Sequence, residues 1–166
     1  MLYPPVPRNS DGSAKYAPYG MRKIEAVLAK EFGEENVIVA HPYDLERFVG
    51  PKTKVIGISS MEPAGVGFVS RTYTSLVGFG GEPIAAAEFR ELIQKPILRK
   101  CGAKIIVGGS GAWQIERAKL REAYKIDSVV MGEGENGVLD LFHKASNGEK
   151  LPPLVETESP EPEKIP

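Results

Sequence analysis

Four short apolar segments predict β-strands. They lie at residues 36–41, 53–59, 103–109 and 126–132, and each is rich in valine and isoleucine. Because the apolar residues run continuously and do not alternate with polar ones, we expect both faces of the sheet to be covered, as in a parallel sheet. Residues 2–3, directly before two prolines, are the expected end of a further strand.

Apolar residues at helical spacing separate these segments. Residues 18–32 carry such a stripe and are followed by Gly33, a common helix stop. Residues 83–93 begin with a proline, which suits a first helical turn. A third helix is expected over residues 110–124, with Trp113 in its apolar stripe, and a fourth after residue 134.

The alternation of strands and helices predicts an α/β fold. We expect a flavodoxin-like three-layer α/β/α sandwich, with a mostly parallel five-stranded sheet in the order 2-1-3-4-5. Residues 1–150 form the predicted domain. Residues 151–166 are rich in proline and glutamate, a composition that predicts an extended linker. The glycine-rich segment from Met61 to Pro83 is longer than the ~2–6 residues usual for such connections, which indicates a functional or mobile loop.

The net charge and the cysteine content limit which classes of function and partner we expect. A net charge of -1 gives no general attraction to nucleic acid or to an anionic membrane. No apolar run is long enough to span a bilayer, and the first residues lack the apolar core of a signal peptide. Cys101 is the single cysteine and has no evident base beside it, so we interpret it as a half-buried thiol. We expect a cytoplasmic protein.

Small residues follow three of the predicted strands, at residues 59–62, 108–111 and 132–135. In an open parallel sheet ligands bind beyond the carboxyl ends of the strands, and small residues there allow a close approach. Any one of these turns is explained by the tight connection from strand to helix. The set of three together favours a ligand-binding edge.

Motifs for specific chemistry are weak. The chain has neither G-x-G-x-x-G at its first helix nor a phosphate-loop lysine after "GGSG". Glu62, Glu133 and Glu135 are candidates for acid–base work, or for capping their own helices. His41 lies at the predicted ligand edge but has no partner that would make it a metal ligand. His143 falls in the last helical stripe and is expected to be structural or exposed.

An ordered set of motifs carries a family resemblance. "YPP", "YAPYGMRKIEAVLAKE", "VIGISS", "IIVGGSGAW", "IDSVVMGEGENGVLDLF" and "NGEKLPPLV" follow one another along the chain. Together they resemble the N-terminal cobalamin-binding-like domain of radical SAM proteins. The resemblance covers the chain from Tyr3 to Val155. Each motif is weak alone, and the order and spacing make the set more specific.

The resemblance implies a cofactor site. In cobalamin domains of this fold the corrin lies over the carboxyl edge of the sheet, and its nucleotide tail enters between strands. The matching positions are Ser59, Ser60, Gly108, Gly109, Gly132, Glu133 and Gly134. By this resemblance the serines lie near the tail, the glycine pair makes room for it, and the last three residues form the turn after the fifth strand.

The resemblance also implies a partner. The linker would lead into a radical SAM barrel in cis, whose C-x-x-x-C-x-x-C motif holds a 4Fe-4S cluster that binds S-adenosylmethionine. Because this chain has one cysteine, the cluster and S-adenosylmethionine belong to the missing domain. This chain alone would then not be an enzyme, although its parent protein would be a radical SAM enzyme. Neither nucleic acid nor a membrane is an expected partner.

One departure from the family pattern leaves alternatives open. Many cobalamin domains carry Asp-x-His-x-x-Gly in the first loop, and its histidine ligates cobalt. The loop "RNSDGSAKYAPYG" has Asp11 and Gly12 but no histidine. A second hypothesis is therefore an accessory domain that binds no cofactor, with Tyr16, Phe68 or Tyr73 filling the site. A third and weaker one is a flavin or nucleotide binder of flavodoxin type.

Overall fold

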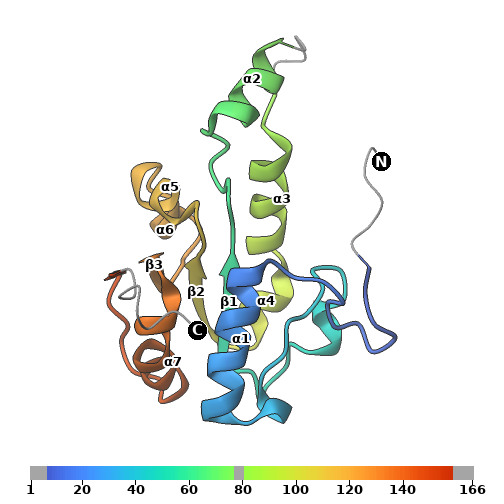
Figure 1. Ribbon diagram of the computed structural model, residues 1–166, viewed down its shortest axis with the longest axis vertical. Helices are drawn as coiled ribbons and strands as arrows, with labels where there is room; N and C mark the ends of the chain where they lie inside the picture. The colour runs from blue at the N-terminus through green and yellow to red at the C-terminus, as the bar shows by residue number, and fades with distance from the viewer. Residues whose placement is uncertain (1–6, 77–80, 159–166) are drawn as a thin grey trace.

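The computed structural model describes residues 7–76 and 81–158, which form an α/β domain (Figure 1). Its strands make one sheet in which every neighbouring pair is parallel, in the order β1-β2-β3-β4. They are β1 (Val55–Ser59), β2 (Lys104–Gly108), β3 (Ser128–Gly132) and β4 (Leu154–Thr157). The predictions at 53–59, 103–109 and 126–132 are confirmed as β1, β2 and β3.

In the described part of the chain one α-helix precedes β1, and the other α-helices lie in the connections between the strands. The α-helices are α1 (Tyr19–Phe32), α2 (Phe68–Leu76), α3 (Ile84–Ile93), α4 (Pro96–Lys100), α5 (Ala112–Arg117), α6 (Leu120–Ala123) and α7 (Val138–Ser146). Short 3₁₀ turns cover Glu34–Asn36, Leu45–Arg47 and Gly134–Asn136. The predicted helices at 18–32 and 83–93 are confirmed as α1 and α3. The third predicted helix is divided into α5 and α6, because Lys119 between them has a left-handed backbone with φ 55°.

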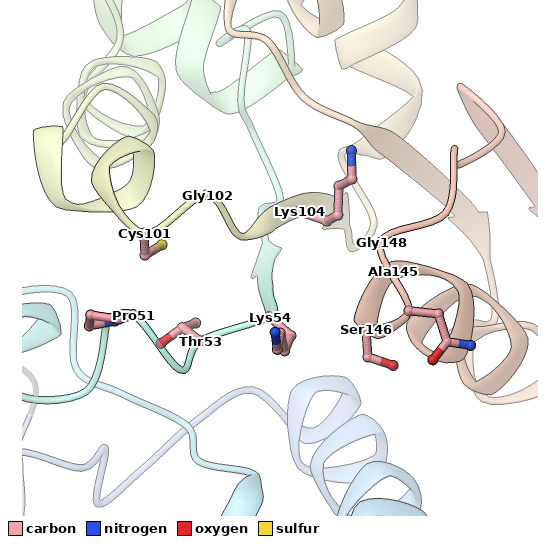
Figure 2. Close-up of a pocket in the computed structure, with 10 residues that line it drawn as sticks. Pro51, Thr53, Lys54, Cys101, Gly102, Lys104, Ala145, Ser146 and Gly148 are labelled. Atoms are coloured by element: carbon pink, nitrogen blue, oxygen red, sulfur yellow. The ribbon is translucent and has the colours of Figure 1, made fainter.

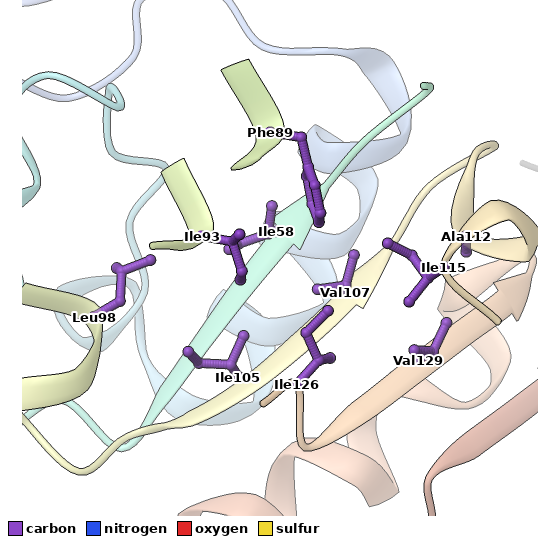
Figure 3. Close-up of a cluster of buried hydrophobic side chains, with 10 residues drawn as sticks. All are labelled: Ile58, Phe89, Ile93, Leu98, Ile105, Val107, Ala112, Ile115, Ile126 and Val129. Carbon is purple, nitrogen blue, oxygen red and sulfur yellow. The ribbon is translucent and has the colours of Figure 1, made fainter. Parts of the chain in front are cut away.

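The larger core lies between the sheet and helices α3 to α6. Ile105 and Val107 of β2 point to this face together with Val129 of β3, and all three are at most 1% exposed. Ile93 of α3 and Ile115 of α5 pack onto them from the helix layer (Figure 3). The continuous apolar strands of the sequence therefore do cover one sheet face with buried side chains.

The opposite face is covered by α7. Ile106 and Val130, which alternate with the residues above, pack with Leu141 and Ala145 of that helix. Gly57 of β1 leaves room for the Phe142 ring, which lies 3.5 Å from where a Cβ would stand. α1 lies beside α7 in the same layer (Figure 1). Helices thus lie on both faces of the sheet, as the apolar strand pattern predicts.

The predicted strand at residues 36–41 is wrong. Its backbone bonds go to the N-terminal loop and not to the parallel sheet: the Ala14 amide donates to the Val39 carbonyl at 2.8 Å, and Ser13 forms an antiparallel bridge with Ala40. Ile38 remains 47% exposed, so the segment buries too little apolar surface to join the core. The valine and isoleucine content indicated a strand of the sheet, but this segment pairs with the N-terminal loop instead.

The predicted linker is folded at its start. Leu154–Thr157 form β4, which pairs with β3 from Val129↔Leu154 to Gly132↔Thr157. The preceding prolines do not prevent pairing, because the Pro153 carbonyl accepts a hydrogen bond from the Val129 amide at 3.0 Å. Leu154 and Val155 pack against the cores on the two faces. The expectation of an unfolded linker from residue 151 is therefore wrong for β4, and residues 159–166 lie outside the described part.

The remaining predictions concern residues 2–3, the number of strands and the segment from Met61 to Pro83. The predicted strand at residues 2–3 lies outside the described residues. The open parallel sheet is compatible with a flavodoxin-like fold, without establishing five strands. The Met61 to Pro83 segment, interpreted as a loop, contains α2, which projects beyond the sheet (Figure 1). Within residues 7–76 and 81–158, no helix has the length and apolar character needed to cross a membrane.

Candidate functional site

The predicted site residues after β1 and β2 do come together at the carboxyl edge of the sheet. Ser59 and Gly108 are partners in the β1–β2 register. The Ser60 amide donates to the Gly108 carbonyl at 3.0 Å, and the Ser60 carbonyl accepts from the Gly111 amide at 3.0 Å. The two turns are therefore joined to each other by backbone hydrogen bonds.

The space beside Gly109 is filled by the chain itself. This glycine has φ 96°, and a Cβ at its position would stand 2.7 Å from Ser59 Oγ and 2.8 Å from the Ser60 carbonyl oxygen. Both distances are too short for a side chain, so glycine is required for the two turns to meet. Gly108 has only ordinary contacts, the nearest to the Val130 carbonyl oxygen at 3.6 Å. Gly109 therefore serves turn packing before it serves any ligand, whereas the contacts of Gly108 do not require a glycine.

The turn after β3 is packed in the same way. A Cβ on Gly132, which has φ 96°, would stand 2.8 Å from Thr157 Oγ1, and a Cβ on Gly134 would stand 2.9 Å from Ile24 Cδ1 of α1. Glu133 lies between them and is exposed. The glycines of "GEGENG" thus allow β4 and α1 to approach the end of β3.

One carboxylate of this turn, that of Glu135, has a structural role. Glu135 forms an ion pair with Lys23 of α1. The hydrogen bond from the Lys23 ammonium lowers the pKa of Glu135 below its ordinary value and raises that of Lys23. A carboxyl with a lowered pKa is a poor general acid near neutral pH. Glu62, the third acid–base candidate, accepts a hydrogen bond from the Gly67 amide at 3.0 Å and so orders its own loop.

Exposed apolar side chains lie beyond the carboxyl end of β1. Residues 61–68 pack against the start of α5, since the Ala64 amide donates to Gln114 Oε1 at 3.1 Å, and against the start of α3, since Gly65 lies against Pro83. We call the exposed apolar residues of these three joined segments the edge patch. Its members are Met61, Val66, Phe68, Ile84 and Trp113.

The edge patch is the surface feature that the sequence analysis missed. Met61 is 76% exposed and Phe68 84%, which is unusual for large apolar side chains grouped on neighbouring segments. Trp113 was assigned to a core stripe, yet it is 44% exposed and has the Arg117 guanidinium 5.9 Å from its ring. Its position one residue after the buried Ala112 is the signal that places it outside the core.

Two of the three aromatic side chains proposed to fill the site are exposed instead. Tyr16 is 63% exposed and Phe68 is among the most exposed apolar residues. The side chain of Tyr73 lies outside the described part of the chain. The edge is therefore not closed by Tyr16 or Phe68.

The histidines and the cysteine lie away from this edge. His41 is buried in the N-terminal loop, where its Nδ1 accepts a hydrogen bond from the Tyr43 amide at 3.3 Å, so its expected place at the ligand edge is wrong. His143 is exposed and lies 2.8 Å from Glu31 on α1. Cys101 is half-buried after α4. Among the described residues no group of three or more His, Cys, Asp or Glu could hold a metal ion.

Two cavities lie elsewhere. One of about 230 Å³ is at the amino edge of the sheet, between the residues before β1, the residues before β2 and the end of α7; Lys54, Cys101 and Ser146 are among its lining (Figure 2). The other, of about 330 Å³, is lined by Glu116, Lys119, Arg121 and Glu122 around α5 and α6. Neither is lined by a predicted site residue.

Comparison with models of known protein families, with curated proteins and with solved structures finds no match for this chain. The family resemblance and the function it implies therefore depend on the residues themselves.

Proposed function

We propose that this chain is a cobalamin-binding-like module of a larger radical SAM protein. Its binding surface for the cofactor or the second domain is the carboxyl edge of the sheet. The edge patch is the observation that carries the proposal. Met61, Phe68 and Trp113 expose large apolar surfaces on the segments that follow β1 and β2. A flat amphipathic cofactor or a second domain would bury such surfaces at a gain of about 25 cal/mol per Å².

The residues fit a cobalamin only in part. The edge patch suits contact with the face of a corrin ring. The spaces beside Gly109, Gly132 and Gly134, where the resemblance puts the nucleotide tail and the turn, are taken by the chain's own atoms. The first loop supplies no histidine for cobalt. A bound corrinoid would supply a methyl group or an electron for radical chemistry in the barrel.

The proposal includes a five-stranded sheet. In the flavodoxin-like order 2-1-3-4-5, β1, β2 and β3 would be the last three strands, and β4 would be an addition at the far edge. The first strand would come from residues 2–3, and residues 36–41 would have to give up their bridge to Ser13 to become the second. A 4Fe-4S cluster and S-adenosylmethionine would lie in the radical SAM domain that follows in cis. The proposed compartment is the cytoplasm.

A second candidate is an accessory domain without a cofactor. The filled glycine positions favour it, because close packing of Gly109 on Ser59 explains the small residues without a ligand. In that case the edge patch contacts the barrel or its substrate directly. Both candidates use the same face, and they differ in whether a corrinoid lies between the two domains.

The test is an absorbance titration with hydroxocobalamin and methylcobalamin, combined with gel filtration. It compares the chain with a longer protein that includes the domain proposed to follow it. The variants are Phe68→Ser and Trp113→Ser in the edge patch. Ile38→Ser is the matched control, because Ile38 is 47% exposed but lies outside the patch.

The outcomes separate the candidates. A spectral change with co-elution, weakened by the patch variants and not by Ile38→Ser, supports the cobalamin module. Binding only in the longer protein supports a site shared between domains. If neither protein takes up cobalamin while both are folded, the cobalamin proposal is wrong and the accessory domain stands.

A further inference from the structure

Thr157, the last residue of β4, contacts both ends of the turn from Gly132 to Gly137. Its hydroxyl donates a hydrogen bond to the Met131 carbonyl at 3.0 Å. A Cβ on Gly137 would stand 2.7 Å from Thr157 Cγ2, and a Cβ on Gly132 would meet the Thr157 hydroxyl and carbonyl. One residue of the C-terminal strand therefore bridges the start and the end of the turn.

α1 holds the middle of the same turn from the other side. Ile24 packs on Gly134, and Lys23 pairs with Glu135. The turn thus lies between a helix from the first fifth of the chain and a strand near its end. Glycine at 132, 134 and 137 weakens the intrinsic preference of the turn for its 3₁₀ conformation, so these neighbours help to hold its shape.

β4 is suited to detach. It has four residues and pairs only with β3 among the described strands, at the edge of the sheet. Short edge elements open at a lower free energy than core strands do. Leu154 and Val155 are only half-buried, whereas Val129 and Val107 in the neighbouring strands are 0% exposed.

We propose that β4 is a strap whose residue Thr157 keeps the Gly132–Gly137 turn closed, and that release of β4 frees the turn. Because β4 runs parallel to β3, Thr157 and Glu158, the last described residues, lie at the carboxyl edge. A partner that binds this end of the chain would therefore shift the equilibrium between paired and released β4. The conformation of the turn at the carboxyl end of β3 would change with it. This last step rests on the proposed function, whereas the closing of the turn by Thr157 does not.

Amide hydrogen exchange of the ligand-free chain tests the strap. Thr157→Ala removes both the hydroxyl and the methyl, and we expect exchange in residues 132–137 to rise on the order of fivefold. Thr157→Ser keeps the hydroxyl and should recover part of the protection. Glu156→Ala is the matched control, because the Glu156 side chain is exposed on the same strand. Residues 105–107 of β2 serve as the internal reference.

Three outcomes are decisive. Faster exchange confined to the turn and β4 in Thr157→Ala, with Glu156→Ala unchanged, supports the strap. No change in the turn overturns it. Faster exchange spread equally over β2 also overturns it, because Thr157 would then act on global stability. Repeating the measurement with hydroxocobalamin tests the proposed function separately, so cobalamin failing to bind leaves the strap result intact.

Discussion

Lys23 of α1 and Glu135, in the turn after β3, form an ion pair that joins the first helix to the carboxyl edge of the sheet. The same contact places Ile24 on Gly134. The glutamates of "GEGENG" therefore differ in role: Glu135 fixes α1, and Glu133 stays exposed at the edge. Docking of the helix explains this glycine-rich acidic turn without a catalytic carboxylate.

The Lys23–Glu135 pair predicts a pH dependence of stability. Because Lys23 lowers the pKa of Glu135 in the folded chain, the pair's contribution is present above the ordinary pKa of 4.5 and is lost as the pH falls through the lowered value. Urea unfolding from about pH 3 to about pH 7 should show wild type and Glu135→Gln converging at the acid end. A stability difference that is constant over this range would contradict the assignment.

Gly132 should tolerate no side chain. Gly132→Ala combines φ 96° with a collision against Thr157, and we expect a loss of about 2–4 kcal/mol in the free energy of unfolding. Gly148→Ala is the control: its φ is 76°, but nothing lies within 4 Å of the added Cβ, so only the backbone cost of about 1–2 kcal/mol applies. Chemical denaturation measures both, and equal losses would show that contact with Thr157 is unimportant.

Local patterns were sufficient for the central sheet and insufficient at its margins. Runs such as Ile105–Val107 identify core strands because their burial on both faces leaves a continuous apolar signal. Residues 36–41 carry the same signal but pair with the loop at Ser13, and only the tertiary structure decides between these partners. β4 was hidden by the prolines that precede it and by the glutamates within and after it, since a four-residue edge strand needs few apolar side chains.

The candidate site also has features that the sequence predicts and features that depend on tertiary contacts. That the turns of Ser59, Gly109 and Gly132 share one edge follows from parallel topology, which the sequence predicts. Ser59 occupies the space beside Gly109, and Thr157 occupies the space beside Gly132. These are contacts between segments that are distant in the sequence, so no local pattern predicts them. The exposure of Trp113 was missed because helical spacing does not show where α5 ends.

Asp44 should be the main polar support of the N-terminal loop. Its buried carboxylate accepts a hydrogen bond from Arg8 Nη1 at 2.6 Å and lies 3.4 Å from Arg47 Nε. Asp44→Ala should cost about 1–3 kcal/mol in the free energy of unfolding, because it leaves both arginines without this partner. Glu46→Ala, at an exposed neighbouring position, should stay within about 0.5 kcal/mol. Equal losses in the free energy of unfolding for the two variants would show that Asp44 does not support this loop.

Shortening the chain tests where the domain ends. A chain ending at Glu158 retains β4 and should keep the stability of the full chain within about 0.5 kcal/mol. A chain ending at Pro153 loses Leu154, Val155 and the pairing with β3, and we expect about 2–4 kcal/mol less stability. Thermal and urea unfolding compare the two. If the shorter chain is as stable as the longer one, the domain ends near residue 150, as the sequence composition predicts, and β4 is an attachment that the fold does not need.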